Sequence, residues 1–285
     1  SKWKNLNGKK FFDYFHKTDF REKLRKGGIP KSVEAVFHFG ACSTTTEKNA
    51  DYVLDNNFTY SKELALFALE NNIRFVYASS AATYGDGSHG YSDKEYNRLK
   101  PLNVYGFSKH IFDLWVIENG YDKIFAGLKY FNVFGPNEYH KGEMASMVYK
   151  AFRQIEETGR IKLFKSNTPK FEDGGQMRDF VYVKDTLDIV FTHFRNRNVN
   201  GIFNIGTGRA RTWNDLAKAV FAAMNKKPQI EYIEMPDSLK NQYQNFTQAD
   251  MTKLEKAVGS LKFKTLEENT ADYVRSHLLN EDKYF

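Results

Sequence analysis

Cysteine is nearly absent from this sequence: among 285 residues, Cys42 is the only one. A single cysteine excludes an internal disulfide and a cysteine metal cluster, and it suits the reducing cytoplasm, where we expect the protein to work. The metal-binding pattern His-Glu-x-x-His is missing as well, so the sequence predicts no metal site. We interpret Cys42 as a small packing residue, because no activating base stands near it in the sequence.

Long hydrophobic runs are also missing. No stretch approaches the ~20 consecutive apolar residues of a membrane-spanning helix, and no apolar core follows the first residues, so we predict neither a membrane span nor a secretory signal. The net charge is +7, but the basic residues are scattered, and no basic block or nucleic-acid motif appears. This pattern argues against a nucleic-acid partner and favours a small anionic ligand, with simple solubility as the alternative.

The glycine-rich turn that opens most nucleotide-binding sheets is absent too. In such sheets the first strand lies centrally, followed by this turn and a helix. Residues 11–20 precede the first clear strand without forming such a unit, and a sheet that lacks its first strand has an unpaired edge. We therefore hypothesise that roughly 35–40 further residues, about one strand–helix–strand unit, precede this sequence in the natural protein, whose intact mass tests the idea.

Strand-like and helix-like patterns alternate along the chain. We expect strands at 33–39, 73–79, 124–131, 178–183, 202–205 and 230–233, and helices at 60–71, 105–115, 143–157, 185–195, 213–224 and 266–279. Such alternation predicts an α/β fold, with helices on both faces of a doubly wound parallel sheet. The pattern loosens after residue 134, so we expect 1–133, completed by 178–206, to form the sheet domain. Residues 134–177 and 207–285 are then expected to form a smaller, discontinuous lobe.

Short segments of small and polar residues follow three of the expected strands, at 40–43, 79–83 and 132–133. The carboxyl ends of parallel strands share one edge of the sheet, and ligands of such sheets bind beyond it. The sequence therefore predicts that these three segments meet at the functional site.

A Tyr-x-x-x-Lys pair, Tyr105 and Lys109, lies in one of the expected helices. Residues i and i+4 share a helix face, so both side chains can reach one point. A cation beside a phenol lowers the tyrosine pKa, which makes Tyr105 a candidate base for removing a proton from a hydroxyl group. A surface tyrosine and a solvated lysine are the alternative, because the pair alone is a weak pattern.

Together with Ser80, which precedes the segment 81–85, this pair resembles the Ser-Tyr-Lys set of the extended short-chain dehydrogenase/reductase family. Longer strings at 38–47, 130–136, 140–142, 178–183 and 246–250 are similar to the subfamily of epimerases that act on ADP-heptose. The similarity spans nearly the whole chain.

The resemblance implies a Rossmann-type domain that binds NADP and a lobe that binds the substrate. It implies inversion of C6 of the heptose in ADP-D-glycero-D-manno-heptose, through a 6-keto intermediate, for lipopolysaccharide core synthesis. A redox cofactor is needed because a carbinol carbon with no adjacent carbonyl holds its proton too firmly for direct removal, whereas a ketone accepts hydride on either face. The resemblance also implies a cytoplasmic homo-oligomer, such as a pentamer, without nucleic-acid or membrane partners.

Four residues receive catalytic roles from the resemblance. Tyr105 exchanges the hydroxyl proton on one face, Lys109 lowers its pKa and holds the cofactor ribose, and Ser80 hydrogen-bonds the reacting oxygen. Lys141, in the string His-Lys-Gly, serves as the acid/base on the other face. A lysine base needs a pKa depressed by burial or by a neighbouring cation, and an exposed loop lysine is the alternative.

Two sets of binding residues also follow from the resemblance. The cofactor set comprises Lys2, Lys17, Phe39, Gly40, Ala41, Cys42, Ser43, Asn56, Tyr105, Lys109 and Val133. The substrate set comprises Ser80, Asn132, Glu143, Lys150, Phe164, Lys165, Ser166, Asn167, Arg178 and Tyr243. The Arg178 guanidinium can fork onto phosphate oxygens, with an ion pair to Asp179 as its alternative. Lys129 stands where relatives often carry arginine, and we expect this difference to be harmless on a strand.

Other functions remain open at this point. A hexose 4-epimerase of the same family would not need Lys141, and a 4,6-dehydratase carries an acidic pair after the active-site threonine position, which the string 81–84 lacks. A non-catalytic nucleotide-binding protein is a third alternative. The joint presence of Ser80, Tyr105, Lys109 and Lys141 argues against it.

Overall fold

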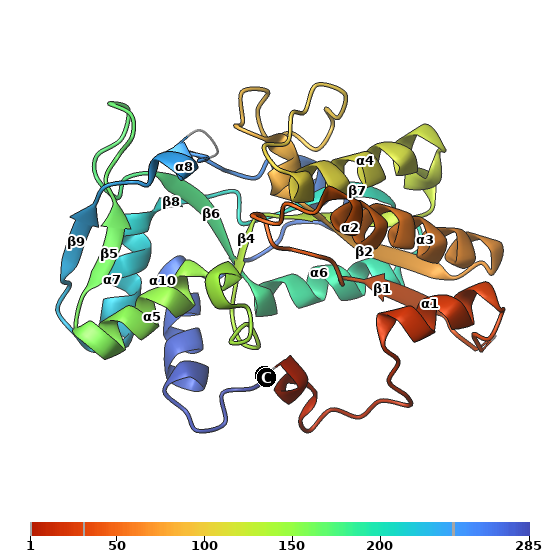
Figure 1. Cartoon of the computed structure of the whole chain (residues 1–285), viewed down its shortest axis with the longest axis horizontal. Coiled ribbons are helices and arrows are strands. Elements are labelled where there is room, and N and C mark those ends of the chain that lie inside the picture. Colours follow the sequence, from red (N-terminus) through yellow and green to blue (C-terminus); the bar gives the residue numbers. More distant parts are fainter. Residues whose placement is uncertain (1, 31, 241–242) are drawn as a thin grey trace.

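The computed structural model describes residues 2–30, 32–240 and 243–285 (Figure 1). Its central sheet has four strands in the order β1-β2-β3-β7, and every neighbouring pair is parallel. The strands are β1 (Ala35–His38), β2 (Arg74–Ser80), β3 (Ala126–Tyr130) and β7 (Gly201–Ile205). Parallel strands joined by helical crossovers confirm the expected α/β class.

Helices cover both faces of this sheet, because successive side chains of a strand point to opposite sides. On β2, Phe75 and Tyr77 pack toward α4, whereas Val76 packs toward α6 on the other face. The helices around this sheet are α1 (Lys17–Arg25), α2 (Ala50–Leu54), α3 (Tyr60–Glu70), α4 (Val104–Glu118), α6 (Val183–Arg195) and α9 (Thr252–Val258). The doubly wound arrangement predicted from the sequence is therefore correct.

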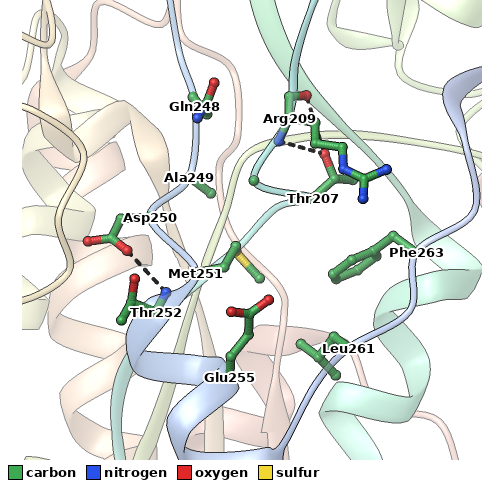
Figure 2. A pocket seen from close by; sticks show the side chains of 11 residues that line it. Thr207, Arg209, Gln248, Ala249, Asp250, Met251, Thr252, Glu255, Leu261 and Phe263 are labelled. Carbon is green, nitrogen blue, oxygen red and sulfur yellow. Dashed lines mark hydrogen bonds between the residues drawn. The ribbon is translucent and has the colours of Figure 1, made fainter.

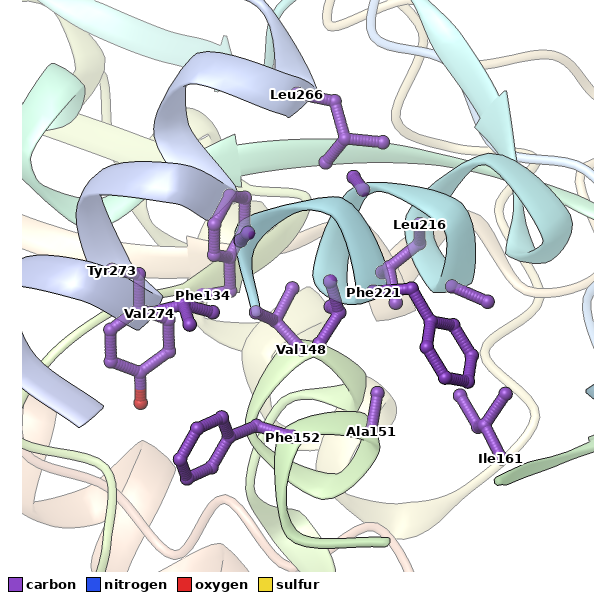
Figure 3. Close-up of a cluster of buried hydrophobic side chains, with 14 of the residues drawn as sticks. Phe134, Val148, Ala151, Phe152, Ile161, Leu216, Phe221, Leu266, Tyr273 and Val274 are labelled. Carbon is purple, nitrogen blue, oxygen red and sulfur yellow. The ribbon is translucent and has the colours of Figure 1, made fainter. Parts of the chain in front are cut away.

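A second group of elements lies beside this sheet, at the left of Figure 1. It contains a sheet of β4 (Asn132–Phe134), β6 (Met177–Tyr182) and β8 (Ala210–Thr212), the pair β5 (Ile161–Phe164) and β9 (Ile230–Ile233), and helices α5 (Met147–Thr158), α7 (Trp213–Ala223), α8 (Asp237–Lys240) and α10 (Leu266–Tyr273). Its core, shown in Figure 3, includes Phe134, Val148, Phe221 and Tyr273. Strand β6, expected to complete the sheet domain, pairs with β4 and β8, and the domain boundaries themselves stay a prediction.

Short helical turns complete the description. The 3-10 helices are η1 (Lys2–Leu6), η3 (Ala81–Tyr84), η4 (Tyr121–Lys123) and η5 (Gly142–Met144), and π-helical turns form η2 (Asp55–Thr59) and η6 (Val274–Leu278). The helix expected from 143 begins at Met147 because the Ser146 hydroxyl accepts from the Tyr149 amide at 3.3 Å and caps α5 there. Among the helices of the described residues, none is both long and apolar enough to cross a membrane.

Local signals explain where two key helices begin. Thr212 and Asp215 form a capping box at the start of α7. The Asn103 side chain accepts from the Gly106 amide at 2.8 Å and starts α4 immediately before Tyr105. The cap of α4 therefore fixes Tyr105 in the first helical turn, at the carboxyl edge of the central sheet.

Candidate active site

Ser80 and Tyr105 come together where β2 ends and α4 begins. The Ser80 hydroxyl accepts from the Ala82 amide at 3.1 Å and caps η3, and it lies close enough to the Tyr105 phenol to lower the pKa of that group. A Cβ atom on Gly106 would lie 2.7 Å from the Ala82 carbonyl oxygen, which is closer than real Cβ contacts allow. Only glycine at 106 lets α4 approach η3 this closely, so it brings the two hydroxyl groups within reach of each other.

The expected effect of Lys109 on Tyr105 is not found in this structure. Burial raises the pKa of Tyr105, the nearby Ser80 hydroxyl opposes this rise, and Lys109 is not among the charges that act on it. The Lys109 ammonium donates to the Ala78 carbonyl at 2.8 Å instead. The predicted lowering of the Tyr105 pKa is therefore wrong for the chain alone, because the desolvation of a buried phenolate dominates.

Burial of the Lys109 ammonium destabilises its charged form. Burial lowers its pKa from 10.5 to about 8, a gap that corresponds to about 3 kcal/mol of unfolding free energy. Between pH 8 and 10.5 the unfolded chain binds this proton and the folded chain does not, so unfolding free energy rises with pH. We expect Lys109→Met to be more stable than wild type at pH 7 and to lose this advantage by pH 10.

Urea denaturation at both pH values measures the effect of Lys109→Met. The exposed Lys256→Met serves as the control, and its difference from wild type should not change with pH. An advantage of Lys109→Met that is equal at pH 7 and pH 10 would show that the buried ammonium is not the cause.

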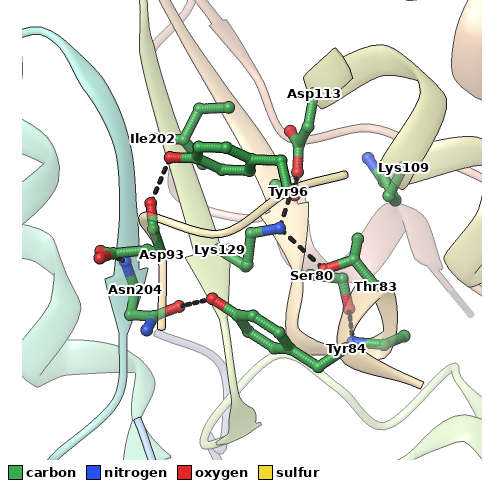
Figure 4. A network of polar contacts seen from close by, with 12 residues as sticks. Ser80, Thr83, Tyr84, Asp93, Tyr96, Lys109, Asp113, Lys129, Ile202 and Asn204 are labelled. Atoms are coloured by element: carbon green, nitrogen blue, oxygen red, sulfur yellow. Dashed lines mark hydrogen bonds and ion pairs between the residues drawn. The ribbon is translucent and has the colours of Figure 1, made fainter. Parts of the chain in front are cut away.

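A buried ionic network lies beneath Ser80 (Figure 4). Lys129 and Asp113 are both inaccessible to solvent and form an ion pair at 2.9 Å. Lys129 also donates to the Thr83 hydroxyl at 2.7 Å, and Asp113 accepts from Ser79 at 2.6 Å and from Tyr77 at 3.0 Å. The network joins β3, α4, the end of β2 and η3, so Lys129 is a buried core residue, and the expectation that lysine in place of arginine is harmless here stays a prediction.

The segment 40–43 lies at the carboxyl end of β1, as predicted, and Asn57 holds it. Asn57 accepts from the Cys42 amide at 2.8 Å, donates to the Cys42 carbonyl at 2.9 Å, and donates to Ser108 of α4 at 3.0 Å. Next to it, Asn56 accepts from Lys17 at 2.6 Å. Asn57 and Ser108 were missed by sequence reasoning. The available signal was a pair of asparagines before an apolar helix.

The remaining members of the predicted cofactor set lie in different places and differ in exposure. Phe39 is 44% exposed and lies edge-on to Tyr130 at the end of β3. Val133 is half-buried on β4. Lys2 lies elsewhere, in η1, where its charge helps to lower the pKa of His140. The structure therefore gathers Lys17, Asn56 and the segment 39–43 near one another but places Lys2 beside the His-Lys-Gly string.

Four residues of the predicted substrate set line one pocket of about 410 Å³: Glu143, Lys150, Phe164 and Tyr243. Glu143 and Lys150 form an ion pair at 3.1 Å across it. The other lining residues are Met147, Gln154, Lys162, Leu163, Trp213 and Ile233, and sequence reasoning missed all of them. Trp213 donates from its indole nitrogen to the Tyr243 hydroxyl at 2.8 Å, so the start of α7 supplies one wall.

Arg178 is buried next to this pocket. Its guanidinium lies 5.0 Å from the ring of Tyr243 and 5.5 Å from that of Trp213, and burial lowers its pKa. Asp179 does not pair with it, because that carboxylate accepts from the backbone amides of Thr207 and Gly208 at 2.8 and 2.9 Å. In the described part of the chain Arg178 has no carboxylate partner, so its charge is available to an anion.

The loop after β5 carries three more predicted residues. Lys165 pairs with Glu234 at 2.7 Å, Ser166 donates to the Thr168 carbonyl at 2.6 Å, and Asn167 is exposed. Asn132 is exposed at the start of β4. These residues lie at or near the surface, where a ligand can reach them, but none of them lines the pocket described above.

Lys141 is exposed in the loop between β4 and α5. Its amide donates to the Glu138 carbonyl at 3.0 Å. The burial that a lysine base requires is therefore not supplied by the chain alone.

A larger pocket, of about 520 Å³, lies at the end of β7 (Figure 2). Its lining includes Thr207, Arg209, Asp250, Glu255 and Phe263. None of the predicted site residues lines it, so it is separate from the candidate active site.

Comparison with known proteins supplies independent information. The family model described as "NAD dependent epimerase/dehydratase family" matches residues 1–206. The ADP-L-glycero-D-manno-heptose-6-epimerase of Nitratidesulfovibrio vulgaris (strain DP4) is 50% identical over 285 residues, covering 99% of this chain and 88% of that protein. The protein of the same name from Fusobacterium nucleatum subsp. nucleatum is 46% identical over 294 residues, covering 99% and 89%.

Solved structures agree with this result. The crystal structure of the ADP-L-glycero-D-manno-heptose-6-epimerase of Helicobacter pylori matches with a TM-score of 0.75 at 28% identity, covering 90% of this chain and 75% of that one. The UDP-N-acetylglucosamine 4-epimerase of Methanobrevibacter ruminantium M1 matches with a TM-score of 0.74 at 23% identity, covering 85% and 76%. The second likeness supports the fold alone.

Proposed function

The chain belongs to the NAD dependent epimerase/dehydratase family, and from this premise we propose that it inverts C6 of the heptose in ADP-D-glycero-D-manno-heptose. The product, ADP-L-glycero-D-manno-heptose, would serve lipopolysaccharide core synthesis. The observation that carries the proposal is the 50% identity with heptose 6-epimerases along 99% of the chain. A cytoplasmic homo-oligomer, such as a pentamer, stays a prediction from the family resemblance.

The residues at the carboxyl edge of the central sheet fit a dinucleotide cofactor. A Cβ atom on Gly40 would have no neighbour within 4 Å, so a ligand can approach the backbone there. Lys17 and Asn56 lie nearby, and Lys17 is the candidate partner of a 2′-phosphate, which favours NADP over NAD. Lys17, Asn56 and the segment 39–43 would hold the dinucleotide, and its nicotinamide would supply the hydride acceptor for oxidation at C6 and the hydride donor for reduction of the opposite face of the ketone.

Tyr105 and Ser80 handle the oxygen on one face of C6. In our proposal the Ser80 hydroxyl orients the C6 oxygen, and Tyr105 takes the proton as the ketone forms and can return it in the reverse direction. The raised pKa of Tyr105 keeps the phenol protonated in the chain alone. It is therefore ready to donate a proton, and it needs added positive charge to act as a base.

Lys141 is proposed to serve the opposite face. Because the side chain is exposed in the chain alone, the substrate itself must exclude water from it before its pKa can fall. A substrate bound between the loop after β4 and the end of β2 would shield the Lys141 side chain from water in this way. The proposal thus assigns one acid/base to each face of the same carbon.

The nucleotide is proposed to occupy the pocket beside Arg178. Phe164 and Tyr243 present aromatic rings at 6.3 Å and near a right angle, which suits a planar base. The buried Arg178 guanidinium lies beside them and is suited to a diphosphate. The diphosphate would then connect this pocket to the sugar at Ser80.

The test is turnover of ADP-D-glycero-D-manno-heptose by the full-length protein with NADP, followed by NMR of the C6 configuration. We expect both C6 epimers to accumulate, and Lys141→Ala to slow inversion by about 100-fold or more, because a positioned acid/base contributes at least that factor. The exposed Lys256→Ala is the control. Inversion by Lys141→Ala at the wild-type rate would reject the two-base proposal, and elimination of water or inversion at C4 would support the other family activities.

A further inference from the structure

Glu138 lies in the loop between β4 and α5, three residues before Lys141, and it is 4% exposed. Its carboxylate accepts from the Ser146 amide at 2.5 Å and from the Ser146 hydroxyl at 2.7 Å. It also accepts from the Tyr273 hydroxyl at 2.9 Å and from the Gly135 amide at 3.4 Å. Four donors therefore converge on one buried side chain.

These bonds close the loop at both of its ends. Gly135 stands where the loop leaves β4, and Ser146 is the cap residue of α5. Tyr273 belongs to α10 and lies in the core shown in Figure 3. The Glu138 carboxylate thus ties a strand end, a helix start and a second helix together, and the segment 139–145 is carried between these anchors.

Lys141 is linked to this anchor through the backbone. Its amide donates to the Glu138 carbonyl at 3.0 Å, and the Met144 amide donates to the Lys141 carbonyl at 3.0 Å. On either side of Glu138, the Asn137 side chain donates to the Phe285 carbonyl at 2.7 Å, and the Tyr139 hydroxyl donates to the Lys283 carbonyl at 2.6 Å. The Lys141 side chain is exposed, so the contacts of its loop set the position from which the side chain extends.

The carboxylate is costly unless it is fully bonded. In the described part of the chain no lysine, arginine or histidine forms an ion pair with Glu138. A buried carboxylate without a counter-ion depends on its hydrogen-bond donors, and a satisfied network of this kind rigidifies the segments that it joins. An apolar side chain would fill the same space without orienting the loop.

We propose that Glu138 is a positioning residue that holds the Lys141 loop in the place needed for inversion at C6. The inference rests on the proposed function, since it gives a purpose to Lys141. Glu138 is proposed to touch neither substrate nor cofactor. It acts by fixing the position of the Lys141 backbone, from which the side chain extends.

The test uses Glu138→Gln, which keeps the size of the side chain. Because every partner aims a donor at the carboxylate, the glutamine amide must place its own N–H groups against one of them. We expect amide hydrogen exchange in 139–145 to become about tenfold faster. We also expect kcat for inversion to fall about tenfold with KM nearly unchanged, because substrate binding does not require the second acid/base.

The control is Glu157→Gln, which changes an exposed carboxylate on α5. This variant should change neither the hydrogen exchange nor kcat by more than about twofold. Unchanged exchange in Glu138→Gln would overturn the proposal, and so would faster exchange with an unchanged kcat. A drop in thermal stability with faster exchange throughout the chain would show a purely structural role. Wild-type protein that fails to invert C6 would reject the proposed function instead, whatever the exchange of this loop shows.

Discussion

Asp113→Asn is expected to lower the free energy of unfolding by about 3–5 kcal/mol, because it leaves a buried ammonium without its counter-charge. Asp113 and Lys129 have no exposed surface, and their charged atoms lie 2.9 Å apart. The same carboxylate accepts from Ser79 and Tyr77, so the variant also disturbs two hydrogen bonds in the core. Urea denaturation at pH 7, with the midpoint and slope compared with wild type, measures the loss.

The double variant separates the charge from the packing. Lys129→Met alone leaves Asp113 unpaired and should also be strongly destabilising, whereas Asp113→Asn combined with Lys129→Met should recover most of the loss. The surface pair Glu22 and Lys26 provides the matched control, since Glu22→Gln should cost less than about 1 kcal/mol. A loss in Asp113→Asn no greater than in Glu22→Gln would show that the buried pair contributes little.

This ion pair also shows where sequence reasoning reached its limit. From the sequence, Lys129 was noted only as a lysine in a position where relatives often carry arginine, and its burial and its partner were not predicted. A signal was nevertheless present: Lys129 is the one charged residue of the apolar strand β3, and Asp113 stands among apolar residues in the middle of α4. The sequence cannot show that these two charges face each other, because this depends on how α4 crosses the sheet.

Elements with a strong local pattern were predicted well. Strand β2 and helices α3 and α7 appear within about two residues of their expected ends, because hydrophobic spacing and caps act locally. Strands β4 and β8 were missed, since three residues each are too few to show an alternating pattern. They exist because β6 lies between them and pairs with both.

In the candidate site, too, local motifs were predicted from the sequence, whereas contacts that depend on tertiary packing were not. The motif with Ser80 and Tyr105 placed two groups that the structure does bring into contact. The sequence could not show that the pKa of Tyr105 is raised, because the depth at which the phenol is buried depends on the packing between α4 and η3. Trp213 was recognised only as the first residue of a helix, yet its indole reaches Tyr243 from a distant part of the sequence.

Tyr105→Phe is expected to reduce the rate of C6 inversion by about 10²–10⁴-fold, which is the usual contribution of a positioned acid/base. The aromatic ring and its packing are kept, and only the hydroxyl group near Ser80 is removed, so the free energy of unfolding should change by about 1 kcal/mol or less. The affinity for ADP should also remain, since Arg178 and its pocket are unaltered. Inversion followed by NMR, thermal unfolding and ADP titration together measure these three expectations.

The pH dependence distinguishes a chemical role of Tyr105 from a structural one. Burial raises the pKa of this phenol, so the fraction present as phenolate, and with it the wild-type rate, should grow with pH between 6 and 8. The residual rate of Tyr105→Phe should lack this increase. Tyr121→Phe serves as the control, because that ring packs against Trp115 outside the candidate site and its rate should stay within about twofold of wild type. Inversion by Tyr105→Phe at a comparable rate would move the proton transfer to another group and leave Ser80 without the partner on which this mechanism depends.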